Sequence, residues 1–259
     1  MSGKTLSVFI TVVVGFLIPE FVLAEVLWTN SSISYLYGEH YEVNYQPGAN
    51  DNIRTVITLE NATGHSWGDS FFFLDQLRSA GNSDATYTEF SPRLSLGKLG
   101  LFQTDEQALI KDLLLSSTIE VSHYDSQFRD NDFINVLYGV AVDLNLPGFR
   151  YFKTNVYYAD NEDQQDDEQV TVTWALPFQL GGTSWLYDGY VDWSTGSRTH
   201  HPSLNWTSQL KWDAGATWGE KNRLFLGIEY VHWDNKFGLK DKPFRTDERN
   251  VNLLVKYHF

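Results

Sequence analysis

The chain has 259 residues and a formal net charge of −14, from 19 Lys and Arg against 33 Asp and Glu; this acidic balance repels a phosphate backbone and argues against nucleic-acid binding. Cysteine is absent, which excludes disulfide scaffolds, thiol catalysis, Cys-ligated zinc and a lipidated Cys anchor. Aromatic residues make up 15% of the chain although its mean hydropathy is negative, and this dispersed apolar content argues against a helical bundle and a helical membrane protein.

Residues 1–24 have the organisation of a secretory signal peptide. A short region with Lys4 precedes an apolar stretch from Leu6 to Ile18, and the segment ends in Val22-Leu23-Ala24. A transmembrane anchor is the alternative, but 13 residues fall short of the ~20 that a spanning helix needs. We therefore predict a signal peptide at 1–24 and an outer-membrane β-barrel domain at 25–259.

After the signal segment, apolar residues recur with a period of two, as in strands with one apolar face. Phe90, Pro92 and Leu94 share one such face, and Glu89 and Arg93 lie on the opposite one. No later window holds 18 apolar residues, so nothing beyond residue 24 is expected to cross a membrane as a helix. The pattern predicts twelve strands, at 28–37, 53–63, 70–78, 86–96, 113–123, 133–145, 149–160, 169–177, 184–193, 204–212, 223–233 and 249–259.

An even number of alternating strands predicts an all-β fold, namely a transmembrane antiparallel β-barrel of about 12 strands. Such a barrel lies in the bacterial outer membrane, where it contacts lipids and lipopolysaccharide. A soluble β-sandwich shares the alternation. The signal segment without any cysteine favours the barrel, and so does the amphipathic last strand that ends in Phe259 after Tyr257 and His258. A C-terminal aromatic residue of this kind is what the barrel insertion machinery recognises. Tryptophans near strand ends fit the aromatic girdles of such barrels: Trp28, Trp174, Trp185, Trp193, Trp206, Trp212, Trp218 and Trp233.

Several motifs run in order along nearly the whole mature chain. They are Ser34-Tyr35-Leu36-Tyr37-Gly38, residues 81–85 followed by 89–95, Asp143 with Leu146-Pro147, Val156-Tyr157-Tyr158, Gly181-Gly182 and Val191-Asp192-Trp193. This ordered set resembles the nucleoside-specific channel-forming outer-membrane proteins, the Tsx-like family that includes the OmpK proteins of vibrios. The resemblance implies a twelve-stranded monomeric barrel with a narrow pore through which nucleosides diffuse passively, and surface loops that phages can use as receptors. We expect no enzyme activity and no cofactor.

Charged residues fall on the faces that are predicted to point inward. At mid-depth a charge facing lipid costs ~2–4 kcal/mol if basic and less if acidic, so we expect these side chains to line the lumen. Aromatic residues share the same faces at period two, and Tyr37 joins the set only through its place in the Ser34–Gly38 motif. The predicted pore-lining residues are Tyr37, Glu60, Phe71, Phe73, Asp75, Glu89, Arg93, Asp143, Lys153, Tyr157, Asp188 and Asp192.

Such a lumen can bind nucleosides weakly. Aromatic rings stack on nucleobases with ~1–3 kcal/mol per base, and carboxylates accept hydrogen bonds from sugar hydroxyl groups. Weak binding suits a passive channel, because a tight site blocks transit. The alternative is that the charges pair with one another and fill the barrel, as Arg93 and Glu89 could do.

Three other motifs have structural explanations. Residues 64–68 match G-x-S-x-G, but they join two strands and not a strand to a helix, so a turn is the better interpretation. His200-His201 lacks metal-ligand spacing, and no metal site is expected. Residues 160–168 hold six acids in nine positions, which predicts a solvated loop; a divalent-cation bridge to lipopolysaccharide phosphates is the alternative.

The sequence thus favours a passive channel for nucleosides, and its acidic charge favours uncharged nucleosides over nucleotides. Two alternatives of other classes stay open: a small general porin and a sealed-barrel surface receptor or adhesin. A barrel enzyme that acts on lipids needs a Ser, a His and a polar partner together on the outer face, and no such trio is visible in the sequence.

Overall fold

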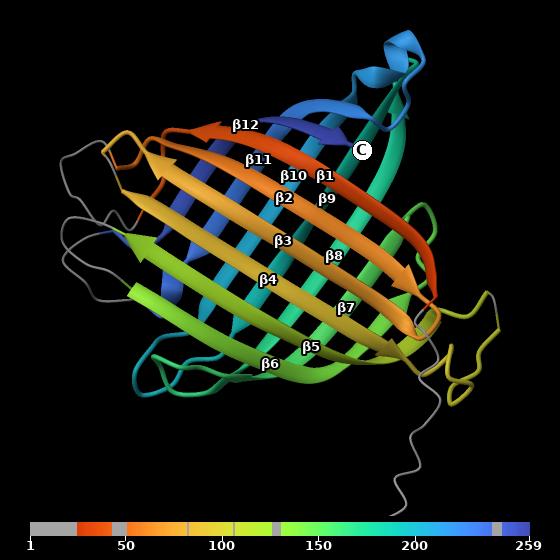
Figure 1. Cartoon of the computed structure of the whole chain (residues 1–259), viewed down its shortest axis with the longest axis horizontal. Helices are drawn as coiled ribbons and strands as arrows, with labels where there is room; N and C mark the ends of the chain where they lie inside the picture. Colours follow the sequence, from red (N-terminus) through yellow and green to blue (C-terminus); the bar gives the residue numbers. More distant parts are fainter. Residues whose placement is uncertain (1–24, 43–50, 82, 106, 126–130, 240–244) are drawn as a thin grey trace, which may run out of the picture.

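The computed structural model describes residues 25–42, 51–81, 83–105, 107–125, 131–239 and 245–259; the predicted signal segment, 1–24, lies outside them. Twelve antiparallel strands form one closed barrel in which each strand pairs with its sequence neighbours and β1 pairs with β12 (Figure 1). The strands are β1 (Val26–Gly38), β2 (Arg54–His65), β3 (Gly68–Ser79), β4 (Asp84–Ser95), β5 (Ile110–Asp125), β6 (Asn131–Leu144), β7 (Tyr151–Asp160), β8 (Asp167–Leu180), β9 (Thr183–Ser194), β10 (Ser203–Asp213), β11 (Leu224–Asp234) and β12 (Glu248–His258).

All twelve predicted strands are confirmed. Two short 3-10 helices, η1 (Gly215–Trp218) and η2 (Lys236–Gly238), lie in the connections that follow β10 and β11. Within the described parts of the chain, no helix has the length and hydrophobicity of a membrane-spanning helix.

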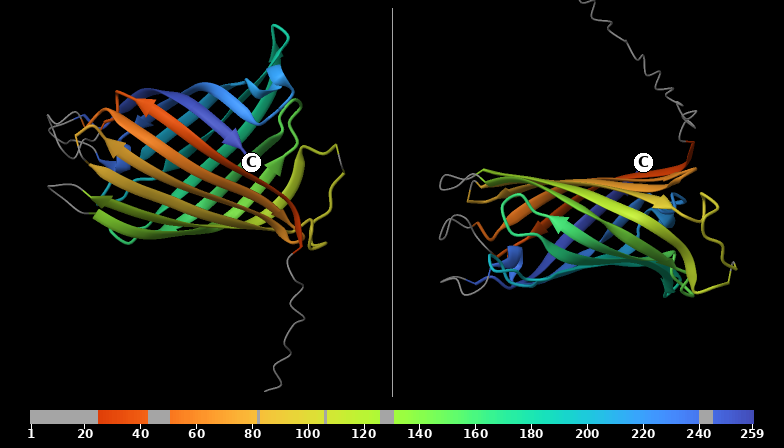
Figure 2. Two further views of the ribbon diagram at one scale, coloured as in Figure 1. Left: turned by 45° about the horizontal axis from the view of Figure 1, so that its top comes forward. Right: turned by 90° about the horizontal axis from the view of Figure 1, so that it is seen from below.

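The connections gather at two ends of the barrel (Figure 2). We call the end that holds the connections after the even-numbered strands, such as the Gly181-Gly182 hairpin, the turn end. Both glycines there have positive φ, 58° and 79°, which a two-residue hairpin of this kind requires. The opposite end, with the connections 39–53, 195–202 and 235–247, is the loop end. In bacterial outer-membrane barrels the longer loops face outward and the tighter turns face the periplasm.

Side chains alternate between the two faces of the barrel wall, as β12 illustrates. Val251, Leu253 and Val255 are 44–65% exposed on the outer face, whereas the intervening Asn250 and Asn252 are at most 1% exposed and point inward. The wall therefore presents apolar side chains to its surroundings and polar side chains to its lumen, as a membrane-spanning barrel must.

Aromatic side chains lie on the outer face near both ends. Trp193 and Trp206 do so toward the loop end, and Tyr257 and Phe259 do so at the turn end, where their ring centroids are 5.7 Å apart. These positions fit the two interfacial girdles of a membrane barrel. Two of the tryptophans expected in the girdles point into the lumen instead, as the register shows: Trp28 and Trp233.

The outer face of β12 generates a stability prediction. Leu253 is 65% exposed in the middle of its strand, so Leu253→Arg places a cation in the hydrocarbon and lowers the free energy of unfolding by about 2–4 kcal/mol. Leu180→Arg, at the end of the β8–β9 hairpin, costs about 0–1 kcal/mol. Urea unfolding in lipid vesicles, followed by tryptophan fluorescence, measures both; equal losses would contradict the membrane position of Leu253.

Candidate functional site

The lumen is the candidate functional site, because the polar faces of all twelve strands converge there. The strand register places eleven of the twelve sequence-predicted pore residues on the inward side of the wall. They are Glu60, Phe71, Phe73, Asp75, Glu89, Arg93, Asp143, Lys153, Tyr157, Asp188 and Asp192.

Tyr37 is the exception, and its assignment to the pore is wrong. It shares the outer face of β1 with Ile33 and Tyr35, while Leu36 points inward. Its hydroxyl donates a hydrogen bond to the exposed Glu39 carboxylate, 2.6 Å away. The motif indicates where Tyr37 stands along the strand but not whether its side chain points inward or outward. The alternation along β1 determines that direction.

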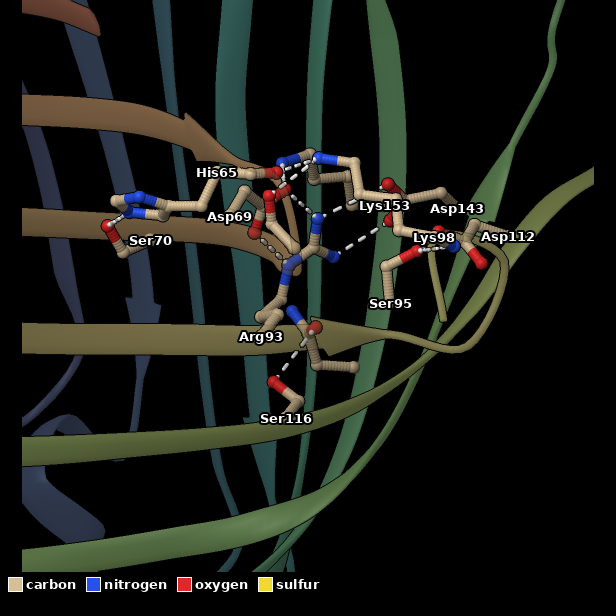
Figure 3. A network of polar contacts seen from close by, with 12 residues as sticks. His65, Asp69, Ser70, Arg93, Ser95, Lys98, Asp112, Ser116, Asp143 and Lys153 are labelled. Carbon is tan, nitrogen blue, oxygen red and sulfur yellow. Dashed lines mark hydrogen bonds and ion pairs between the residues drawn. The ribbon is translucent and has the colours of Figure 1, made fainter. Parts of the chain in front are cut away.

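Near the turn end, two cations and two carboxylates form a neutral cluster (Figure 3). The buried Arg93 donates through Nε and Nη2 to the two oxygens of Asp69, at 2.8 and 2.6 Å, and through Nη1 to Asp143 Oδ1, at 2.8 Å. Lys153 Nζ donates to Asp69 Oδ2 at 3.0 Å. Such bidentate, charge-assisted contacts hold the guanidinium in one orientation. The sequence suggested an ion pair between Arg93 and Glu89, but in the structure Arg93 pairs with Asp69 and Asp143 instead.

Asp69 is a member of this cluster that the sequence analysis missed. It continues the period-two series of Phe71, Phe73 and Asp75 toward the start of β3, so the alternation could have placed it on the inward face. Arg93 stands directly opposite it on the next strand, β4, whereas the second cation, Lys153, comes from the distant strand β7.

A second set of ion pairs joins β2, β9, β10 and β12. Lys211 Nζ donates to Asp188 Oδ2 at 2.7 Å and to Gln209 Oε1 at 2.8 Å, and Lys256 pairs with Glu60. The two lysines were missed, although both stand opposite apolar neighbours in their strands. Here too each cation has a carboxylate partner, so these pairs add no net charge to the lumen.

Among the other inward carboxylates, five interact electrostatically with one another, and we call them the carboxylate belt. Among the ion pairs of the described residues, none involves a member of this group. Glu89 and Glu120 stand directly opposite each other on β4 and β5, and Asp75 interacts electrostatically with Glu229. The members are Asp75, Glu89, Glu120, Asp192 and Glu229.

Neutral groups hold the carboxylate belt in place. Asp75 accepts a hydrogen bond from Thr58 at 2.5 Å, and Asp192 accepts one from Thr171 at 2.6 Å. The other belt members accept theirs from Tyr87, Asn135, Gln209 and Asn252. These donors are neutral, so they orient the carboxylates through hydrogen bonds and not through ion pairs.

Aromatic rings lie beside the belt on β3 and β4. The Phe71 and Phe73 ring centroids are 5.9 Å apart, and Phe73 and Tyr87 are 5.8 Å apart. The Tyr87 hydroxyl donates to Glu89 Oε1 at 2.7 Å. Apolar ring faces therefore adjoin hydrogen-bond acceptors, an arrangement suited to a solute with a flat ring and hydroxyl groups. Tyr87 was missed, although it stands at period two from Glu89.

The remaining motifs have structural roles. Residues 64–68 form the turn between β2 and β3, as expected. The acidic segment 160–168 is largely exposed, as expected for a solvated loop. Asp167 is the exception: it is buried, with His200 Nε2 2.8 Å from its carboxylate. Asp166 accepts a hydrogen bond from the Tyr158 hydroxyl at 2.6 Å. In the part of the chain that the structure describes, no group of three or more His, Cys, Asp or Glu is arranged to hold a metal ion.

Comparison with known proteins gives a family and several distant structural likenesses. The KdgM porin is 8% identical, with a TM-score of 0.48 and coverage of 88% of this chain and 99% of that one. The NanC porin is 9% identical, with a TM-score of 0.45 and coverage of 89% and 99%. Omp33 of Acinetobacter baumannii is also 9% identical, with a TM-score of 0.42 and coverage of 89% and 98%. No curated protein matches.

The family model described as nucleoside-specific channel-forming protein, Tsx, matches residues 30–259, which is nearly the whole barrel. The chain therefore belongs to the Tsx family of nucleoside-specific channel-forming proteins, and it is a β-barrel channel of the bacterial outer membrane and not an enzyme.

Proposed function

We propose that the barrel selects uncharged nucleosides for passive diffusion across the outer membrane. The observation that carries this proposal is the row of Phe71, Phe73 and Tyr87 rings beside the carboxylate belt. The family description supports the same substrate class.

A nucleoside has two parts that this lumen can recognise. Its base offers a flat face to the aromatic row, where stacking contributes ~1–3 kcal/mol. Its ribose hydroxyl groups donate hydrogen bonds to belt carboxylates such as Glu89 and Asp75. Both interactions are modest, which is what a channel needs in order to release its solute on the far side.

Charge separates nucleosides from nucleotides. In the described lumen, Arg93, Lys153, Lys211 and Lys256 each have a carboxylate partner, so none is left to bind a phosphate group without losing that partner. The acidic carboxylate belt repels the phosphate as well. Uncharged solutes meet neither obstacle.

The proposal extends to how the protein reaches the membrane and to what contacts its outer surface. Residues 1–24 serve as the secretory signal, and Phe259, 69% exposed at the end of β12, is the contact for the insertion machinery. The connections at the loop end serve as a receptor surface for phages. Hydrogen bonds that tie 165–168 to 195–200 give this surface a defined shape.

Removal of one ring tests the aromatic row. Phe73→Ala is expected to lower the ratio of uridine flux to the flux of a sugar of similar size about fivefold or more, since ~1 kcal/mol of stacking changes an equilibrium by that factor. Phe72→Ala, which removes the same ring from the adjacent outward position, leaves the ratio unchanged. Flux is measured by swelling of liposomes that contain each variant.

The wild-type protein decides between the candidate functions in the same assay. Equal swelling rates for uridine and the sugar would make the protein a small general porin. No swelling with any solute, together with no single-channel conductance, would identify a sealed barrel.

Charge in the carboxylate belt is tested separately. Glu89→Gln keeps an acceptor for the Tyr87 hydroxyl but removes a carboxylate, so we expect the reversal potential in a KCl gradient to shift toward anion permeability and uridine monophosphate to enter faster. Asp163→Asn, on the exposed segment between β7 and β8, changes the net charge equally and leaves both readouts unaltered. An identical response of the two variants would exclude the belt as the source of charge discrimination.

A further inference from the structure

At the loop end, part of the lumen is filled by a connection that folds inward. Tyr41, in the segment that follows β1, is buried and packs against Leu36, Val56 and Leu254. Those three side chains point inward from β1, β2 and β12. The Tyr41 ring therefore occupies space inside the barrel and does not lie over its rim.

A second connection reaches the same place from η2. Lys236 is buried, and its Nζ donates to Glu248 Oε2 at 2.5 Å. The Nζ also lies 4.9 Å from the Trp233 ring centroid, 5.4 Å from that of Phe237 and 5.8 Å from that of Tyr41. Burial lowers the pKa of Lys236, and the adjacent Glu248 carboxylate opposes that shift. Three aromatic faces and one carboxylate thus replace the water around this ammonium group.

The backbone on both sides of Lys236 adopts a costly conformation. Asn235 and Phe237 have φ of 47° and 59°, in the left-handed region that non-glycine residues rarely occupy. Such strain persists only where surrounding contacts enforce it, and it concentrates at functional positions. Here the strained turn directs Lys236 into the barrel.

Glu248 connects the two inward segments. Besides pairing with Lys236, its Oε2 accepts a hydrogen bond from the Glu42 backbone N–H at 2.8 Å. Two residues further along β12, Asn250 Oδ1 accepts one from the His40 N–H at 3.2 Å. Both segments are therefore anchored on the inner face of one strand, at a carboxylate that is itself fully buried.

We propose that Tyr41 and Lys236 form a wedge that narrows the outer mouth of the channel and sets the size of the solutes that enter, with Glu248 as its positioning residue. On β8 and β9, four and three strands from β12 around the ring, the inward side chains of Gln169, Thr171 and Asp192 keep partial solvent exposure. Solutes pass between the wedge and this wall of β8 and β9. The inference rests on the channel function of the family and does not depend on which solute the lumen prefers.

Removal of the wedge is expected to widen the mouth. Lys236→Ala and Tyr41→Ala should each raise single-channel conductance about twofold or more, and should admit disaccharides that the wild-type channel excludes in liposome swelling. The matched control is Arg245→Ala, because Arg245 is a cation of the same connection but its side chain is 62% exposed, in contrast to the buried Lys236. Wild-type conductance and wild-type size exclusion in both wedge variants would overturn the proposal.

Glu248→Gln tests the positioning role. The amide keeps an acceptor for the Glu42 N–H but loses the charge that holds Lys236, so conductance and disaccharide entry should rise as in Lys236→Ala. Lys236→Arg, which preserves the ion pair, should restore wild-type behaviour in size exclusion. A wild-type response of Glu248→Gln, beside an enlarged channel in Lys236→Ala, would show that Glu248 does not position the wedge.

A labelling experiment gives a readout that does not require conductance. The chain has no cysteine, so Asn252→Cys, on the inward face of β12 beyond the wedge, is its only thiol. A polar thiol reagent should modify this cysteine slowly in the otherwise wild-type protein and at least several-fold faster when Lys236→Ala is added. Heat-dependent mobility in detergent electrophoresis verifies that each variant is folded, and equal labelling rates in folded proteins would contradict the wedge. If labelling accelerates while nucleosides show no preference over sugars, the substrate proposal fails and the wedge stands.

Discussion

Pairing of every backbone amide inside the membrane is the constraint on which the rest of this structure depends. A strand edge left open in hydrocarbon costs several kcal/mol per unsatisfied group, and the barrel avoids this cost by joining β1 to β12. Closure then gives each strand one face toward lipid and one toward an enclosed, narrow space. Polar residues that would be dispersed over the surface of a globular protein are brought together in that space, so the pore chemistry follows from the same alternation that makes the wall.

The lumen uses its charged residues in two different ways. Where cations occur, as at Arg93 and Lys211, they are buried with carboxylates and stabilise the wall without a net charge. The carboxylate belt has neutral hydrogen-bond donors instead of cationic partners. In the function proposed here, the belt and the aromatic row discriminate among solutes, between the neutral cluster toward the turn end and the proposed wedge toward the loop end.

The sequence could predict those features of the fold and of the lumen that depend on residues close together in the chain. The period of two predicted all twelve strands and the inward direction of eleven pore residues, because a side chain's face follows from its own strand. Tyr37 was misplaced because it was assigned by its motif and not by the alternation. The partners of Arg93 were not predictable in this way, since Asp69 and Asp143 meet it only through strand register and barrel curvature. The wedge lies in connections without periodicity, where only the folded chain shows that Tyr41 and Lys236 turn inward.

The contact between Lys153 and Asp69 has a consequence for assembly. These residues belong to β7 and β3, four strands apart, and in a flat sheet they would be separated by about 19 Å. Their 3.0 Å contact exists only once the sheet has curled. The Arg93–Asp69 pair stands between adjacent strands and can form in the β3–β4 hairpin. The contacts of Lys153 with Asp69 and of Arg93 with Asp143 need the curved sheet. These two contacts therefore act late in folding and favour the bent intermediate from which the first and last strands can meet.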